Sequence, residues 1–383
     1  MSDGHEEAVA TLEARADKLR SLLQYAPRAF VMEFAGTPKS GKSTSVEAVR
    51  HFFSRYEFRV HVLSERAAVC PIPMKGHLFF NTWCACSMLA ELLANVETET
   101  DLVIVDRGLF DALVWLTLQE RRGELSASEA RAIEGFLLLE RWRTLIDLAI
   151  VMSVAAEEAL ARENNQRITS KGGSIMNPEV LTAITQSVDD AIGRYGPKFS
   201  GVIHHKTTGQ NVKQSNVELG VKVLGHLETF LDPEILVVSR HEIESLPLEG
   251  GGSFGGLAFA KAMDCISKHG RFMRRAQAES DSHYVQIVPG GVLRYETGVF
   301  FFQRKETDPK YRLYGKNSIW QGCHVSRREG VHVSDLIEKA LLERLARSLF
   351  LSRVFPIKPL GYCWDRDGPS SGRHFGLIYE VEI

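Results

Sequence analysis

Apolar residues along the first 231 positions recur at two spacings, and the alternation between the two predicts an α/β unit. Apolar runs of strand length occur at 28–34, 58–63, 101–106, 148–154 and 201–205. Helical spacing separates these runs, with one helix expected at 5–24 and the last at about 215–231. Strands that alternate with helices favour a parallel sheet with helices on both faces, which is a three-layer αβα arrangement.

The pattern changes near residue 232. A new strand is expected at 234–240, followed by the glycine-rich stretch "LEGGGSFGG" at 248–256. Beyond 283 the predicted strands are short and mixed, and one helix of about 334–350 lies among them. We therefore expect an N-terminal helical segment at 1–27, an α/β domain at 28–232 and an α+β domain at 233–383.

Composition argues against several classes of binding partner. Lys and Arg number 46 and Asp and Glu 48, so the net charge of −2 argues against a general nucleic-acid binder. No apolar run reaches the ~18 residues of a membrane helix, and the acidic start "MSDGHEEAVA" is unlike a signal peptide. The six cysteines have no C-x-x-C spacing, which argues against zinc. We expect a cytoplasmic protein and leave a homo-oligomer open.

The stretch "GTPKSGKST", residues 36–44, matches the pattern G-x-x-x-x-G-K-[ST] between a predicted strand and a predicted helix. Backbone N–H groups of such a turn, together with the helix N-terminus, bind phosphate. Lys42 is expected to reach the β- and γ-phosphates and Ser43 to ligate Mg²⁺. The predicted phosphate-binding residues are Gly36, Lys39, Ser40, Gly41, Lys42, Ser43 and Thr44.

Two further strands end in charged residues. "DLVIVD" ends in Asp106, which could hold Mg²⁺, and the adjacent Arg107 could clamp an acceptor phosphate. The alternative is a plain Asp–Arg pair on the surface. Glu65 and Arg66, in "LSERA", follow the strand at 58–63 and project from the same edge of the sheet.

Aromatic residues and a basic segment complete the predicted site. Phe79, Phe80 and Trp83 form a candidate wall for base stacking, with ordinary core packing as the alternative. The polar segment 159–181 contains Arg162, Arg167 and Lys171 and would suit a mobile lid over transferring phosphates. The alternative for this segment is an exposed basic helix end and loop.

These motifs give residues 28–231 a resemblance to the thymidylate-kinase-like branch of P-loop nucleoside and nucleotide kinases. The matching parts are "FAGTPKSGKST", "SERA", "VDRG" and the arginine-containing segment. The resemblance implies ATP and Mg²⁺ as cofactors, with the donor bound by Lys42, Ser43 and Thr44.

The same resemblance implies how an acceptor would be held. Glu65, Arg66 and Arg107 would bind it, and Arg162 and Arg167 would close over the phosphates. The chain departs from the family at Asp106-Arg107-Gly108, where an aromatic residue or Ser usually follows the Arg, and "SERAA" stands for the "REPGG"-like segment. A nucleoside hydroxyl would need Glu65 or Asp106 as its base, whereas a monophosphate would need none.

The stretches "DSHYVQIVPGGVLRYETGVFFFQRK" and "LGYCWDRDGPSSGRHFGLIYEVE" give residues 234–383 a resemblance to a Nudix-type domain whose metal-binding helix is altered. The corresponding helix reads "KALLERLARSLF" at 339–350, with Glu343 its single carboxylate and Arg344 and Arg347 where carboxylates are expected. Divalent metals need several oxygen ligands, so we predict that hydrolysis is lost. The domain would bind or sense a nucleotide, or serve as a scaffold. His324, Asp365, Asp367 and His374 could line its pocket or be ordinary surface residues.

The predicted function is ATP-dependent phosphoryl transfer to a nucleoside or nucleoside monophosphate, with Lys42, Asp106, Arg162 and Arg167 as catalytic residues. The alternative is a nucleotide-binding regulator, suited by fold analogy to stress or anti-phage responses, whose output is not phosphoryl transfer. A guanine-nucleotide switch is disfavoured because the chain has no N-K-x-D motif.

Overall fold

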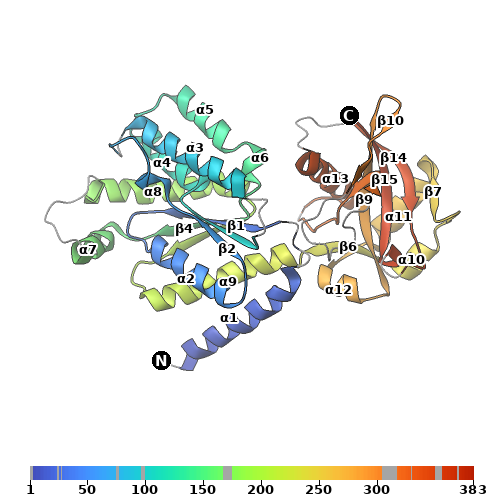
Figure 1. Cartoon of the computed structure of the whole chain (residues 1–383), viewed down its shortest axis with the longest axis horizontal. Coiled ribbons are helices and arrows are strands. Elements are labelled where there is room, and N and C mark those ends of the chain that lie inside the picture. Colours follow the sequence, from blue (N-terminus) through green and yellow to red (C-terminus); the bar gives the residue numbers. More distant parts are fainter. Residues whose placement is uncertain are drawn as a thin grey trace. The chain divides into compact units, whose positions relative to one another are not determined.

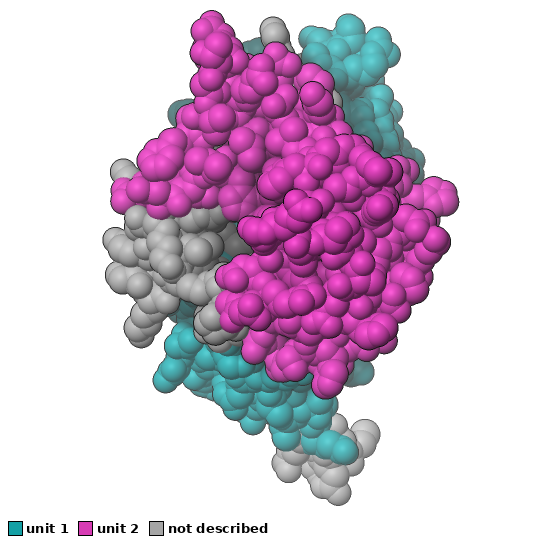
Figure 2. Space-filling model, turned by 90° about the vertical axis from the view of Figure 1, so that its right-hand side faces the viewer, with its two compact units in different colours: residues 1–231 teal, residues 232–383 magenta. Residues whose placement is uncertain are grey.

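The computed structural model divides the chain into two compact units, Met1–Leu231 (unit 1) and Asp232–Ile383 (unit 2), which Figure 2 colours separately. The residues that it describes are 3–23, 26, 28–74, 77–95, 100–166, 175–303, 317–328, 330–349, 356–368 and 371–383. The break follows the last helix of unit 1.

Unit 1 is built on a five-stranded parallel sheet with the order β2-β3-β1-β4-β5. The strands are β1 (Phe30–Gly36), β2 (Val60–Leu63), β3 (Leu102–Asp106), β4 (Leu148–Ser153) and β5 (Val202–Lys206). All seven residues of β1 are buried, as expected for the central strand of a sheet covered on both faces. The predicted parallel α/β arrangement is confirmed.

Helices cover both faces of this sheet (Figure 1). The helices of unit 1 in the described residues are α1 (Asp3–Leu22), α2 (Lys42–Arg55), α3 (Leu78–Asn95), α4 (Leu109–Arg121), α5 (Ala127–Leu137), α6 (Glu140–Arg143), α7 (Ala156–Gln166), α8 (Pro178–Tyr195) and α9 (Val212–Leu231). Because strand side chains alternate between faces, Val31 and Ala35 of β1 face a core shared with α3, α4 and α8. Helices α2 and α9 cover the other face, which completes the three layers.

The N-terminal helix α1 packs on α9 rather than standing apart from the α/β unit. Leu12, Ala16 and Leu19, which share one helical face, are all buried. At the polar margin of this contact, Arg15 Nε lies 2.8 Å from Glu228 Oε1. The helix expected at 5–24 therefore contributes an outer layer of unit 1.

The order of the strands indicates that a ligand would bind at the edge of the sheet where the strands have their carboxyl ends. The connection after β1 leads to β2 at one side, and the connection after β4 leads to β5 at the other. In open α/β sheets, ligands bind outside the carboxyl ends of the strands near such a reversal. The loops that follow β1, β2 and β3 all leave from this edge.

Unit 2 is an α+β domain around a mixed sheet with the order β7-β14-β15-β9-β6-β8, and β10 and β13 also pair with β9. Its strands are β6 (Glu234–Ser239), β7 (Gly252–Phe254), β8 (Arg271–Arg274), β9 (Tyr284–Tyr295), β10 (Gly298–Val299), β11 (Phe302–Gln303), β12 (Asn317–Ser318), β13 (Trp320–Gly322), β14 (Ile357–Cys363) and β15 (His374–Glu382). Its helices are α10 (Arg240–Glu244), α11 (Gly256–His269), α12 (Arg275–Ser280) and α13 (Val333–Leu349). The helix expected at 334–350 is α13.

The longest strands, β9 and β15, pair in parallel through the centre of this sheet. Helices α11 and α13 share a hydrophobic core with them, while α12 packs with β6 and β8 in a smaller cluster. The strands beyond 283 include short ones, as expected. Phe300 and Phe301, between β10 and β11, are exposed.

Candidate phosphate-binding site

The loop at 36–44 joins the carboxyl end of β1 to the first turn of α2, as the sequence motif requires. Gly36 has a φ of +118°, and a Cβ there would lie 1.9 Å from the carbonyl oxygen of Met152. Gly41 caps α2 with a φ of +93°. Only glycine accommodates such backbone at low cost, so the loop can curl tightly beneath the helix N-terminus. First-turn N–H groups have no partner within a helix and favour an anion.

Lys42 lies at the centre of this loop. Its Nζ donates to the carbonyl oxygens of Gly36 at 3.0 Å and of Thr37 at 2.5 Å. Burial, together with the charge of the nearby Arg107, lowers the pKa of Lys42 to about 7. A bound phosphate would add negative charge and favour the protonated amine.

Of the other predicted loop residues, two bond to neighbouring groups and two have exposed side chains. Ser40 is buried and its Oγ donates to the carbonyl oxygen of Thr37 at 2.9 Å. The Nζ of Lys39 lies 2.8 Å from Glu163 Oε2 on α7. Ser43 and Thr44, in the first turn of α2, have exposed side chains. The two hydroxyl groups are thus accessible to a ligand or an ion.

Arg162, on α7, is bonded to the backbone of the loop. Its guanidinium donates to the carbonyl oxygen of Lys39 at 2.9 Å, to the carbonyl oxygen of Thr207 at 2.9 Å and to Glu158 Oε1 at 2.6 Å. Thr207, just past β5, in turn donates from Oγ1 to the carbonyl oxygen of Ser40 at 3.1 Å. Arg162 therefore braces the loop. Its predicted closure over phosphates stays a prediction, and Arg167 and Lys171 lie outside the described residues.

The ends of β2 and β3 bring an arginine and two carboxylates to the same place. Arg107 Nε lies 2.8 Å from Glu65 Oε1, and Arg107 itself has a left-handed φ of +65°. Burial raises the pKa of Asp106. The charges of Arg107, Asp106 and Glu65 all act on the amine of Lys42. The loop and the two strand ends therefore form one site.

Asp111, which the sequence analysis did not single out, connects the parts of this site. The carboxylate is buried in the first turn of α4. It accepts from the N–H of Gly36 at 2.9 Å and from Arg107 Nη1 at 3.1 Å. It also accepts from Trp115 Nε1 at 3.2 Å. The available signal was a single carboxylate in the otherwise apolar run "LFDALVWL".

Glu33 is a second buried carboxylate that the sequence analysis missed. It is fully buried in β1 and accepts from the N–H groups of Gly108 at 2.9 Å, Phe110 at 3.0 Å and Asp111 at 2.8 Å. These donors open α4, so the carboxylate lies at the positive end of that helix. Burial nevertheless raises its pKa to about 7, because desolvation outweighs the hydrogen bonds.

The contact with Glu33 gives a reason for glycine at position 108. A Cβ on Gly108 would lie 2.9 Å from the carboxyl carbon of Glu33 and 2.9 Å from a methyl group of Val105. A side chain at this position would push the buried carboxylate away from its three donors. The departure from the family pattern in "VDRG" thus follows from the packing beneath the turn.

The remaining predicted acceptor residues lie near or on α3. Arg66 donates from Nε to Ser87 Oγ at 3.0 Å, and its Nη1 lies 3.3 Å from Glu91 Oε1. Phe80 is partly exposed in the first turn of α3, and Phe79 beside it is 67% exposed. Phe79 is therefore not packed in the core. The rings of Phe79 and Phe80 are accessible to a base.

In unit 2, Glu343 of α13 is held in an ion pair, with Arg328 Nη1 donating to Oε1 at 2.9 Å. Asp365 and Asp367 line a cavity of about 730 Å³ together with Trp364 and Arg366. His324 and His374 do not line this cavity. They lie near each other, with ring centroids 5.8 Å apart.

Comparison with known proteins gives similarities rather than a family. No family model matches the chain. Protein YmaB of Bacillus subtilis (strain 168) is 34% identical over 103 residues, which is 26% of this chain and 50% of that protein. The match thus spans about half the length of that relative.

Solved structures are similar to the chain over separate parts. Deoxyadenosine kinase from M. mycoides, with products bound, is 14% identical and covers 51% of this chain and 99% of its own, with a TM-score of 0.39. Thymidylate kinase from Candida albicans is 12% identical over 52% of this chain and 94% of its own, with a TM-score of 0.37. Tm1382, a putative Nudix hydrolase, is 20% identical over 39% of this chain and 75% of its own, with a TM-score of 0.32.

The α/β P-loop character of unit 1 rests on its own strand order and on the geometry of the loop at 36–44. Among the helices in the described part of the chain, none is both long and apolar enough to cross a membrane.

Proposed function

We propose that unit 1 transfers a phosphoryl group from ATP–Mg²⁺ to a nucleoside or a nucleoside monophosphate. The observation that carries this proposal is the second cation at the site. Arg107 lies between Glu65 and Asp111, beside a phosphate-binding loop that already contains Lys42. An arginine that two carboxylates hold in place, with 20% of its side chain exposed, suits a second phosphate or the charge that develops during transfer.

The donor side is assigned to the loop. Its backbone N–H groups and Lys42 would hold the ATP phosphates. The exposed hydroxyl of Ser43 and the carboxylate of Asp106 would supply oxygen ligands to Mg²⁺, which completes its shell with phosphate oxygens and water. Neutralising the transferred phosphate is the chemistry that the ion would supply.

The acceptor side is assigned to the ends of β2 and β3 and to the start of α3. Arg107 and Arg66 would hold an acceptor phosphate, and Phe80 would stack on its base. If the acceptor is a nucleoside, its hydroxyl needs a base. Glu65 is the candidate base where Asp106 ligates Mg²⁺, and Asp106 is the candidate where it does not.

Unit 2 is proposed to bind a nucleotide or diphosphate without hydrolysing it. The ion pair between Glu343 and Arg328 engages the single carboxylate of residues 339–350. The 730 Å³ cavity at Asp365, Arg366 and Asp367 combines two acids and a guanidinium, groups that could contact a base and its phosphates.

The test is a panel of nucleosides and nucleoside monophosphates with ATP–Mg²⁺, with products identified by mass. We expect the wild type to phosphorylate at least one acceptor and Lys42→Ala to slow this by at least about 10²–10³-fold. Lys222→Ala is the matched control, because Lys222 forms an exposed ion pair with Glu218 on α9. ATP binding without any phosphorylated product would reject transfer and favour the nucleotide-binding regulator.

Two arginine variants then separate transfer from binding. Arg167→Ala should lower turnover far more than ATP affinity, because an arginine over the phosphates acts mainly on the transition state. Arg162→Ala should lower ATP affinity as well, because Arg162 holds the backbone of the loop. Equal losses of turnover and affinity in Arg167→Ala would argue against catalysis by that residue.

A further inference from the structure

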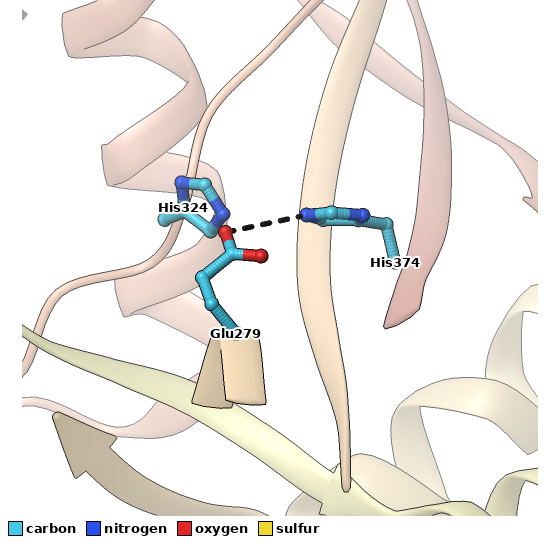
Figure 3. A group of neighbouring side chains, drawn as sticks. All are labelled: Glu279, His324 and His374. Carbon is cyan, nitrogen blue, oxygen red and sulfur yellow. Dashed lines mark ion pairs between the residues drawn. The ribbon is translucent and has the colours of Figure 1, made fainter. Parts of the chain in front are cut away.

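Three side chains of metal-ligand type meet in unit 2, outside the sites described above. Glu279 comes from α12, His324 follows β13 and His374 opens β15. One ligand atom from each lies within 4.8 Å of those of the other two. Figure 3 shows the carboxylate and the two imidazole rings directed toward a common point. Segments 45 and 50 residues apart in the chain therefore deliver these groups to one place.

His324 gives an independent sign that a ligand belongs here. Its Nε2 is buried and has no hydrogen-bond partner in the described part of the chain. A buried polar atom left without a partner is destabilising, and native proteins rarely leave one so.

The spacing of the other two groups is that of ligands before an ion draws them together. His374 Nε2 lies 4.0 Å from Glu279 Oε1, which is too long for a hydrogen bond. Around a tetrahedral ion with bonds of about 2.0–2.2 Å, neighbouring ligand atoms are about 3.3–3.6 Å apart. Because all three ligand atoms lie within 4.8 Å of one another, contraction by at most about 1.5 Å suffices. The side chains of Glu279 and His374 are 23% and 25% exposed, which leaves a path for the ion.

We propose that Glu279, His324 and His374 form a site for a divalent transition metal of the zinc class, with a fourth position open to water or a small ligand. Two imidazoles and one carboxylate favour zinc over Mg²⁺ or Ca²⁺, which prefer oxygen ligands. The absence of paired cysteines argued against zinc from the sequence, but this site uses no thiolate.

Two arginines shape the site. Arg373 Nη1 donates to the backbone carbonyl oxygen of Glu279 and so holds the end of α12. Arg275 Nε lies 3.9 Å from Glu279 Oε1, the oxygen that also faces His374. An incoming dication must take over this carboxylate from Arg275. Once bound, the metal would join α12, the segment after β13 and β15, and so stabilise unit 2.

The test uses the full chain after treatment with a chelator. Zinc content is measured by mass spectrometry after gel filtration, Co²⁺ absorption reports tetrahedral coordination, and thermal unfolding is recorded with and without Zn²⁺. We expect one equivalent of zinc and a higher Tm. His324→Ala and His374→Ala should each weaken zinc binding more than about 100-fold, because even the loss of an outer partner costs 10–100-fold.

Two further variants keep the result interpretable if a histidine substitution impairs folding. Glu279→Gln keeps the size of the side chain and removes its charge, and it should also weaken zinc binding. His269→Ala is the matched control, since His269 pairs with Glu242 at 3.5 Å elsewhere in unit 2. The proposal is overturned if the wild type retains no zinc, or if Glu279→Gln and His374→Ala bind it as tightly as His269→Ala does.

Discussion

The two units place their chemical groups in opposite ways. In unit 1, the site is built around one contiguous stretch, the loop at 36–44, and the charged residues that join it end neighbouring strands. In unit 2, the contiguous helix that resembled a metal-binding motif is engaged in an ion pair. Its metal-ligand residues instead come from three separate segments. In unit 1 the sequence motif itself lies at the proposed site, whereas in unit 2 the proposed metal site lies away from the helix that carries the motif.

The two sites also differ in the hydrogen bonds of their buried groups. In unit 1, the buried carboxylates Glu33 and Asp111 accept backbone N–H groups and hold the turn that carries Arg107. In unit 2, the buried His324 Nε2 has no such partner within the described residues. The two buried carboxylates of the first site are supplied with hydrogen-bond donors by the fold, whereas the buried ring nitrogen of the second has no such partner among the described residues.

Removing Asp111 should have the largest effect. Asp111→Ala leaves Arg107 with one partner and the N–H of Gly36 with none, so we expect a loss of about 3–5 kcal/mol in unfolding free energy. Urea unfolding measures it. Asp190→Ala is the control, because its exposed pair with Arg121 contributes about 0–1 kcal/mol. Equal losses of unfolding free energy in Asp111→Ala and Asp190→Ala would mean that the buried hydrogen bonds of Asp111 do not stabilise unit 1. The contrast drawn with unit 2 would then be wrong.

The pH dependence of Glu33 sharpens the same contrast. Its folded pKa of about 7 lies above the ordinary 4.5, so the folded state binds the proton more tightly than the unfolded chain. Stability contributed by this group is therefore full below pH 4.5 and falls as the pH rises toward 7. The free energy of unfolding of the wild type minus that of Glu33→Gln should fall by on the order of 3 kcal/mol across this window. A flat difference between pH 4 and pH 8 would contradict it.

A side chain at Gly108 should have a smaller but distinct effect. Gly108→Ala places a Cβ 2.9 Å from the carboxyl of Glu33, and overpacking of this kind costs about 1–3 kcal/mol. Gly193→Ala, in the last turn of α8 with no atom within 4 Å of the new Cβ, should be neutral or stabilising. In thermal unfolding, the Tm should fall for Gly108→Ala and should stay the same or rise for Gly193→Ala. Equal shifts would mean that the turn is not built around Glu33.

The smallest effect is expected in α13. Glu343→Gln should leave activity on nucleoside diphosphate-linked substrates unchanged, because we predict none, and should change stability by at most about 1 kcal/mol. Glu380→Gln, which interrupts a similar pair with Arg294, is the control. A metal-dependent hydrolysis that disappears in Glu343→Gln would make the two units alike, each with a working contiguous motif.

Much of unit 1 could be predicted because its signals are local. The runs at 101–106 and 148–154 became β3 and β4, since apolar periodicity reports burial on both faces of a sheet. Gly36 and Gly41 were recognisable because their left-handed backbone tolerates no other residue at low cost. The strand ends that carry Glu65, Asp106 and Arg107 followed from the parallel order of the strands.

The partners of individual side chains could not be predicted in this way. The expected role of Arg162 over the phosphates stays a prediction, but its bonds to the loop backbone and to Thr207 were not foreseen. The expected role of Arg66 at the acceptor also stays a prediction, and its contacts with Ser87 and Glu91 of α3 were not foreseen either. Each of these contacts joins segments that are separated in the chain, so no spacing in the sequence encodes it.

The sequence by itself therefore determined the layered α/β unit, the phosphate-binding loop and the α+β character of the second unit, because periodicity and glycine conformation act over a few residues. Only the tertiary structure decided that Glu33 and Asp111 support the loop and that His324 meets Glu279 and His374. Burial removes water from such groups, so their states depend on whichever distant residue the fold brings within reach.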